Sequence, residues 1–86
     1  MFDVRYEGLR IAPSYSATRE LMREGKALED AKEVLDYGIP APRKRKKGTI
    51  EKWLRKDNKT YSAVVVRSHY AVLHEDVWLL IHFGKF

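Results

Sequence analysis

Histidine and arginine side chains in the last third of the chain have the chemistry needed to act on a phosphate ester. The imidazole group of histidine suits proton transfer in catalysis, so His69 or His82 could serve as a general base or acid. Arg67 follows three valines, and a cation projecting from a sheet there could stabilise the charge of a pentacovalent phosphorane. Structural roles fit these residues as well: His82 within a sheet, and Arg67 in a salt bridge to Asp76 or Glu75.

A metal site has a weaker basis in the sequence. His69 and His74 precede Glu75 and Asp76, and these residue types can ligate a metal, but their spacing matches no specific motif. The chain has no cysteine, which excludes disulfides, thiol catalysis and thiolate metal sites. No phosphate-cradling glycine loop is present either. We therefore expect no metal and no cofactor, and any catalysis would be metal-independent.

The strongest local signal is a basic run in the middle of the chain. Residues 43–59 contain nine basic and two acidic residues, a net charge of +7, whereas residues 1–42 carry −2 and residues 60–86 carry 0. Such a concentration of cations neutralises phosphates and releases counterions, which predicts salt-dependent binding to nucleic acid. Tyr61, like Trp53, could stack on unpaired bases. The residues expected to contact nucleic acid are Arg43, Lys44, Arg45, Lys46, Lys47, Lys52, Arg55, Lys56 and Tyr61.

The first half of the chain must supply the elements that position these residues. Residues 2–11 alternate as a strand or short hairpin arm with a bend at Gly8. Helices are predicted over residues 15–24, after a serine N-cap at position 14 or 16, and over residues 28–37, ending at Gly38. Residues 39–42 indicate an extended linker. Like-charge repulsion predicts a mobile basic loop at 43–48.

Strands dominate the second half. Residues 49–56 fit a helix or a strand, and the turn signal at 57–59 favours a strand. Residues 60–68 and 77–83 are predicted as central strands, joined by a loop over 69–76, because they are apolar on both faces. The sequence therefore predicts one domain, residues 1–86, with an α+β fold: two N-terminal helices packed on an antiparallel sheet of three to four strands.

The order of these parts resembles a prokaryotic domain family related to RelE-like toxins. The resemblance rests on the helical segments at 16–25 and 28–38, the strand signals at 56–61 and 64–66, and the closing segment at 77–82. Such domains are grouped with the barnase, EndoU, colicin and RelE ribonucleases. The resemblance implies metal-independent RNA cleavage by basic and histidine side chains on a sheet, with His82, His69 and Arg67 as the candidates here.

The chain departs from that family pattern in its first helix. Ser16 stands where the family tends to have a histidine, and Glu20 and Glu24 stand where it tends to have arginines. If the helix histidine is the family's general base, this protein binds RNA without cutting it, or uses His82 or His69 instead.

Three functions therefore stay open at this point. The first is an RNA-contacting, toxin-like domain with or without ribonuclease activity. The second is a non-catalytic nucleic-acid-binding module, and the third is a protein-interaction domain with an acidic, antitoxin-like partner. No apolar stretch reaches the length of a membrane span, and the first residues lack a signal-peptide core. We expect a cytoplasmic protein with no membrane partner, and the sequence leaves its oligomeric state open.

Overall fold

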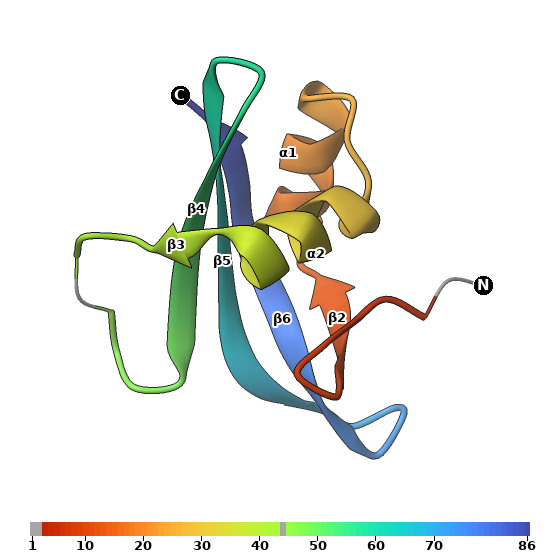
Figure 1. Cartoon of the computed structure of the whole chain (residues 1–86). Helices are drawn as coiled ribbons and strands as arrows, with labels where there is room; N and C mark the ends of the chain where they lie inside the picture. Colours follow the sequence, from red (N-terminus) through yellow and green to blue (C-terminus); the bar gives the residue numbers. More distant parts are fainter. Residues whose placement is uncertain (1–2, 44) are drawn as a thin grey trace.

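A computed structural model describes residues 3–43 and 45–86 as two helices and a six-stranded mixed sheet that curls around them (Figure 1). Lys44, one of the predicted nucleic-acid contacts, lies outside the described residues. The strands and helices, in chain order, are β1 (Arg5–Tyr6), β2 (Leu9–Pro13), α1 (Tyr15–Arg23), α2 (Leu28–Tyr37), β3 (Ile39–Pro40), β4 (Thr49–Lys56), β5 (Lys59–Tyr70) and β6 (Glu75–Lys85).

The sheet corrects the predicted architecture. The sheet of the described chain has six strands in the order β1-β2-β6-β5-β4-β3. The prediction of two N-terminal helices packed on three to four antiparallel strands was therefore wrong. A hairpin precedes the helices, and its second strand, β2, pairs in parallel with β6, with Arg10 opposite Val77 and Pro13 opposite Leu80. The remaining neighbours are antiparallel. Residue alternation cannot reveal which strands pair, and β1 and β3, of two residues each, are too short to show a pattern.

Local chemistry explains where the helices begin and end. Ser14 Oγ accepts a hydrogen bond from Ala17 N at 3.1 Å, which makes Ser14 the N-cap of α1. Gly25, with φ of 66°, takes the left-handed conformation that turns the chain after this helix. Gly38 is needed for space, since a Cβ there would lie 2.7 Å from the backbone oxygen of Trp53.

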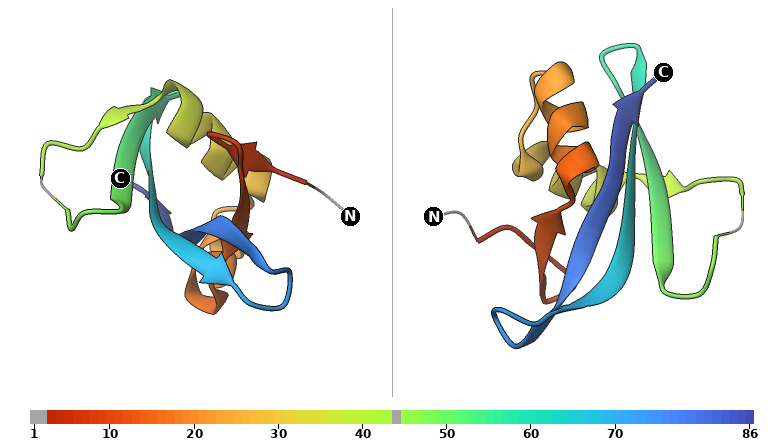
Figure 2. Two further views of the ribbon diagram at one scale, coloured as in Figure 1. Left: turned by 90° about the horizontal axis from the view of Figure 1, so that it is seen from below. Right: turned by 180° about the vertical axis from the view of Figure 1, so that it is seen from behind.

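The second half of the chain forms longer strands than predicted. Residues 49–56 are a strand, and Asp57 and Asn58, with φ of 54° and 63°, make the two-residue turn that joins β4 to β5. The predicted loop at 69–76 shrinks to a tight turn, because β5 continues to Tyr70 and β6 begins at Glu75. Figure 2 shows this turn and the loop between β3 and β4 projecting from different sides of the molecule.

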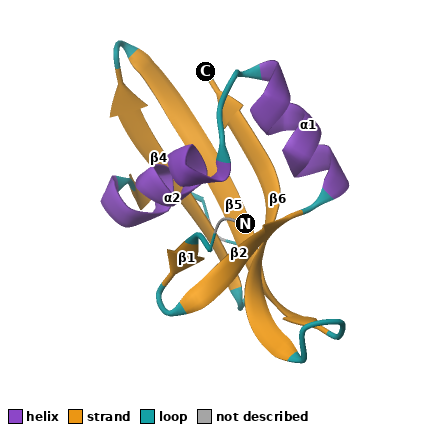
Figure 3. Ribbon diagram, turned by 90° about the vertical axis from the view of Figure 1, so that its right-hand side faces the viewer, coloured by secondary structure: helices purple, strands orange, loops and turns teal. Residues whose placement is uncertain are grey.

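The core lies between the helices and one face of the sheet (Figure 3). Helix α2 contacts β1 near one edge of the sheet and β4 near the other, which a curled sheet permits. Ala63, Val65 and Leu80 are fully buried on this helix-covered face. Alternation then places Glu51, Val64 and His82, which lie opposite one another on β4, β5 and β6, on the opposite face. We call this opposite face the outer face.

Helix α1 accepts a backbone hydrogen bond from β6 beyond the end of β2. The ladder between β2 and β6 stops at Leu80, and further along β6 the N–H of the buried Phe83 donates to Glu20 Oε1 at 2.9 Å. Lys85 Nζ likewise lies 3.1 Å from Glu24 Oε1. Glu20 therefore supplies the acceptor that a neighbouring strand would give the Phe83 N–H, whereas the Glu24 contact is a side-chain ion pair.

Replacing Glu20 by alanine should destabilise the domain by about 1–3 kcal/mol, because the Phe83 N–H loses its acceptor at a buried position. Urea unfolding followed by circular dichroism measures the loss. Glu20→Gln keeps an acceptor oxygen and should lose less; equal losses for the two variants would contradict the role of this hydrogen bond.

Candidate nucleic-acid interface

A buried carboxylate organises the start of the basic loop. The Glu51 side chain on the outer face of β4 is only 2% exposed. Arg43 Nε and Nη2 donate to its two oxygens at 3.0 and 2.9 Å, while Arg45 Nε and Trp53 Nε1 each donate at 2.9 Å. Each carboxylate oxygen thus accepts two N–H donors, so the desolvated charge is compensated. We call Glu51, Arg43, Arg45 and Trp53 the Glu51 cluster.

The cluster changes the expected behaviour of the loop. Hydrogen bonding by Arg43 is the largest of the causes that lower the pKa of Glu51 to about 2, with Trp53 and Arg45 adding to it against the opposing effect of burial. The same hydrogen bond raises the pKa of Arg43. Glu51 therefore stays charged at neutral pH, and the loop predicted to be mobile is anchored at Arg43 and Arg45.

The other described cations of the basic segment have different surroundings. Lys46 and Lys47 are exposed in the loop, and Lys52 and Arg55 lie on β4. Among the residues that the structure describes, none of these four makes an ion pair. Lys56 differs, since its Nζ lies 2.9 Å from Glu33 Oε1 on α2, a contact that raises the Lys56 pKa. Lys56 is therefore engaged within the fold.

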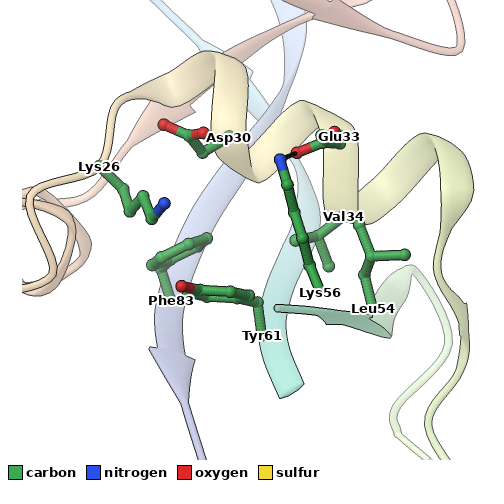
Figure 4. Close-up of a pocket in the computed structure, with 8 residues that line it drawn as sticks. All are labelled: Lys26, Asp30, Glu33, Val34, Leu54, Lys56, Tyr61 and Phe83. Atoms are coloured by element: carbon green, nitrogen blue, oxygen red, sulfur yellow. Dashed lines mark hydrogen bonds and ion pairs between the residues drawn. The ribbon is translucent and has the colours of Figure 1, made fainter. Parts of the chain in front are cut away.

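Tyr61 points toward the helices. Its ring stacks on Phe83 with centroids 6.1 Å apart, and Lys26 Nζ lies 5.2 Å from the ring centroid (Figure 4). The aromatic surface on the outer face comes instead from Trp53 and Phe86, whose rings meet edge-on at 5.0 Å. Phe86 is 67% exposed, and sequence reasoning missed it. The strand predicted over 77–83 continues to Lys85, and extending its alternation of faces would have placed Phe86 beside the sheet.

Two of the three candidate catalytic residues converge on one carboxylate. His69 Nδ1 lies 3.1 Å from Asp76 Oδ1, and Arg67 Nη2 lies 3.5 Å from Asp76 Oδ2. These contacts, the His69 hydrogen bond first, lower the pKa of Asp76. The backbone N–H of Arg67 also donates to Gly48 O at 2.8 Å, so this group adjoins the end of the basic loop. The salt bridge from Arg67 to Asp76, one of the alternatives that the sequence left open, is present.

His82 lies apart from that group. It is opposite Val64 on β5, five residues from His69, or about 17 Å along the strand at about 3.3 Å per residue. Alternation also places it on the outer face, where its Nδ1 lies 3.7 Å from Glu20 Oε1. His82 and the Arg67–His69 pair therefore cannot flank one phosphate.

No family model, curated protein or solved structure matches this chain. Function must therefore be argued from the geometry of its own side chains. Within residues 3–43 and 45–86, no three histidine, aspartate or glutamate side chains come together as a metal site. Neither helix of the described chain is long and apolar enough to cross a membrane.

The stability of the domain should depend on pH through Glu51. Its pKa of about 2 in the folded protein is below the ordinary value of 4.5, so the folded state binds this proton more weakly than the unfolded state does. The stabilisation is complete above about pH 4.5 and is lost as the pH falls through about 2. Over that range the Glu51 contribution to the free energy of unfolding should fall by about 3 kcal/mol.

Urea unfolding of the wild type and of Glu51→Gln at a series of pH values measures this contribution. The stability difference between them should shrink as the pH falls, because protonated Glu51 and glutamine have similar charge. A difference that stays constant with pH would show that Glu51 is not held as a charged group.

Proposed function

We propose that this domain binds single-stranded RNA through a basic surface on the 43–48 loop and β4. The described residues of this surface are Arg43, Arg45, Lys46, Lys47, Lys52 and Arg55. The Glu51 cluster is the observation that supports the proposal, because it holds two arginines in one arrangement before any ligand arrives. Such preorganisation lowers the entropic cost of binding an anion, whereas a loop that served solubility alone would gain nothing from it.

The neighbouring aromatic rings favour a single strand. Trp53 and Phe86 present an aromatic surface on the outer face, where alternation also places Arg55, whereas Lys52 is opposite Ala63 on the other face of β4. Stacking on an aromatic side chain stabilises each unpaired base by about 1–3 kcal/mol. Bases inside a duplex are not available for such stacking. The resemblance to RelE-like toxins points to RNA as well, and an RNA partner would place the domain in the cytoplasm.

Lys46→Ala combined with Lys47→Ala should weaken RNA binding and make it less dependent on salt. Each lost phosphate contact lowers the slope of log affinity against log salt by about 0.7 for a single strand, so the pair should lower it by about 1.4. Fluorescence anisotropy of a labelled oligouridylate over a range of salt concentrations gives both values. Neither lysine contacts Glu51, so the cluster stays intact.

Arg19→Ala combined with Arg23→Ala on α1 makes the same change in net charge away from this surface and serves as the matched control. Equal losses in the two double variants would show that net charge alone attracts RNA. An acidic peptide that binds while RNA does not would favour the antitoxin-like partner.

The Arg67–Asp76–His69 group supports a second candidate function, metal-independent RNA cleavage. Asp76 accepting from His69 Nδ1–H would leave Nε2 free to take the proton of a ribose 2′-hydroxyl. The 2′-oxygen would then form a bond to the adjacent phosphorus as the bond to the 5′-oxygen breaks, giving a 2′,3′-cyclic phosphate. The departing 5′-oxygen would take a proton from water, and Arg67 would stabilise the phosphorane.

Labelled structured RNA incubated with the protein in EDTA should yield fragments ending in cyclic phosphate on a denaturing gel. His69→Ala should slow cleavage by about 10²–10⁴-fold, the usual contribution of a general base. His74→Asn, in the adjoining turn where φ is 52°, is the matched histidine control. Loss of cleavage with His82→Ala alone would show that His82, on the outer face, is the general base. RNA that stays intact with every variant would refute cleavage and favour a domain that only binds RNA.

A further inference from the structure

A pocket beside the Glu51 cluster gathers cations from the loop and from β4. Its volume is about 360 Å³. Arg43, Arg45 and Lys52 line it together with the apolar side chains of Pro40 and Ile50. Glu51 and its two arginines lie on the outer face of β4, whereas Ile50 and Lys52 alternate onto the other face, so the pocket lies at the edge of the strand. Its three cations all belong to the basic surface proposed to bind RNA.

Among the described residues, several N–H groups of the side chains that line this pocket have no acceptor. Arg45 contacts Glu51 through Nε alone, which leaves both of its Nη groups for another acceptor. Arg43 uses Nε and Nη2, which leaves Nη1. Within the described parts of the chain, the Lys52 ammonium group has no hydrogen-bond or ion-pair partner either. The pocket therefore offers three Nη groups on two guanidinium groups that Glu51 already fixes in place, together with the Lys52 ammonium group.

The charge of the pocket indicates which anion it suits. Its described lining includes three cations, Arg43, Arg45 and Lys52, and two carboxylates, Glu7 and Glu51. Their sum is +1, which matches the single negative charge of a phosphodiester rather than the roughly twofold charge of a terminal phosphate monoester. A guanidinium group also presents a planar pair of donors that suits two phosphate oxygens.

We infer that this pocket binds one backbone phosphodiester, and that Glu51 is the positioning residue of the site. The inference rests on the proposed function and names the place where the RNA chain is held. Glu51 touches no phosphate in this arrangement; it holds Arg43 and Arg45 so that their remaining N–H groups converge on one. The phosphate oxygens accept from those groups and from Lys52.

This role predicts that removing the negative charge of Glu51 weakens RNA binding, although the protein becomes more positive. If Glu51 acted on RNA only through its charge, Glu51→Gln would bind RNA more tightly, because the protein becomes more positive. If Glu51 positions the arginines, the same variant binds more weakly, because a neutral amide does not hold both guanidinium groups. Arg45→Lys should also weaken binding although it preserves charge, since an ammonium group lacks the planar donor pair.

The test measures labelled oligouridylate binding to the full chain by fluorescence anisotropy. Glu51→Gln and Arg45→Lys should each lose about tenfold in affinity, the effect of one charge-assisted hydrogen bond. Arg23→Lys on α1 should bind as the wild type does. Lys52→Ala leaves the Glu51 cluster intact and should lower the salt slope by about 0.7, so the inference stays testable if Glu51→Gln fails to fold.

A second probe separates this inference from the proposed function. Dimethyl phosphate, a phosphodiester without bases, should shift the amide resonances of residues 49–52 in an NMR titration of the wild type and not of Lys52→Ala. Phosphate binding there without RNA binding would refute the proposed function and keep the site. RNA binding that is unaffected or tightened by Glu51→Gln, and unaffected by Arg45→Lys and Lys52→Ala, would keep the function and overturn the site.

Discussion

The parallel pairing of β2 with β6 is the constraint on which the rest of this fold depends. It joins a strand near the start of the chain to one near its end over only four residue pairs. Parallel strands cannot be joined by a tight turn, so the intervening chain must cross the sheet, and both helices pack on one face as it does. Both helices of the described chain therefore lie on the helix-covered face, and the outer face carries the Glu51 cluster and the Trp53–Phe86 pair.

The features that could be predicted from the sequence are those fixed by neighbouring residues. Ser14 as a possible cap, Gly25 after the first helix, and Asp57 and Asn58 in a turn all act over a few positions. The partner of β2 could not be predicted, because it depends on backbone groups 67 residues apart in the chain, such as those of Arg10 and Val77. Ile39 and Pro40 read as a linker because a two-residue strand has no visible period.

The candidate site also contains some residues that could be predicted from their neighbours and others that could not. A high local charge identified the basic loop, and the two-residue spacing of Arg67 and His69 is compatible with one strand face. Glu51 could not be recognised, because a single acidic residue among many cations is expected to be solvated. Its role depends on the loop turning back along β4, so that Arg43 and Arg45, eight and six positions earlier, reach the same carboxylate. Only Trp53, two residues further on, could be placed beside it by alternation.

The sheet ends on both sides in a strand of two residues, β1 and β3. Beyond these short strands, single hydrogen bonds engage the longer ones: Ala41 N donates to Glu51 O of β4, and the Phe83 N–H of β6 donates to Glu20 Oε1. These two contacts use backbone groups of β4 and β6 that another strand would otherwise pair with, one on each side of the sheet. A partner that added a strand at Glu51 or Phe83 would first have to displace the contact present there, so β-augmentation is opposed at these two positions.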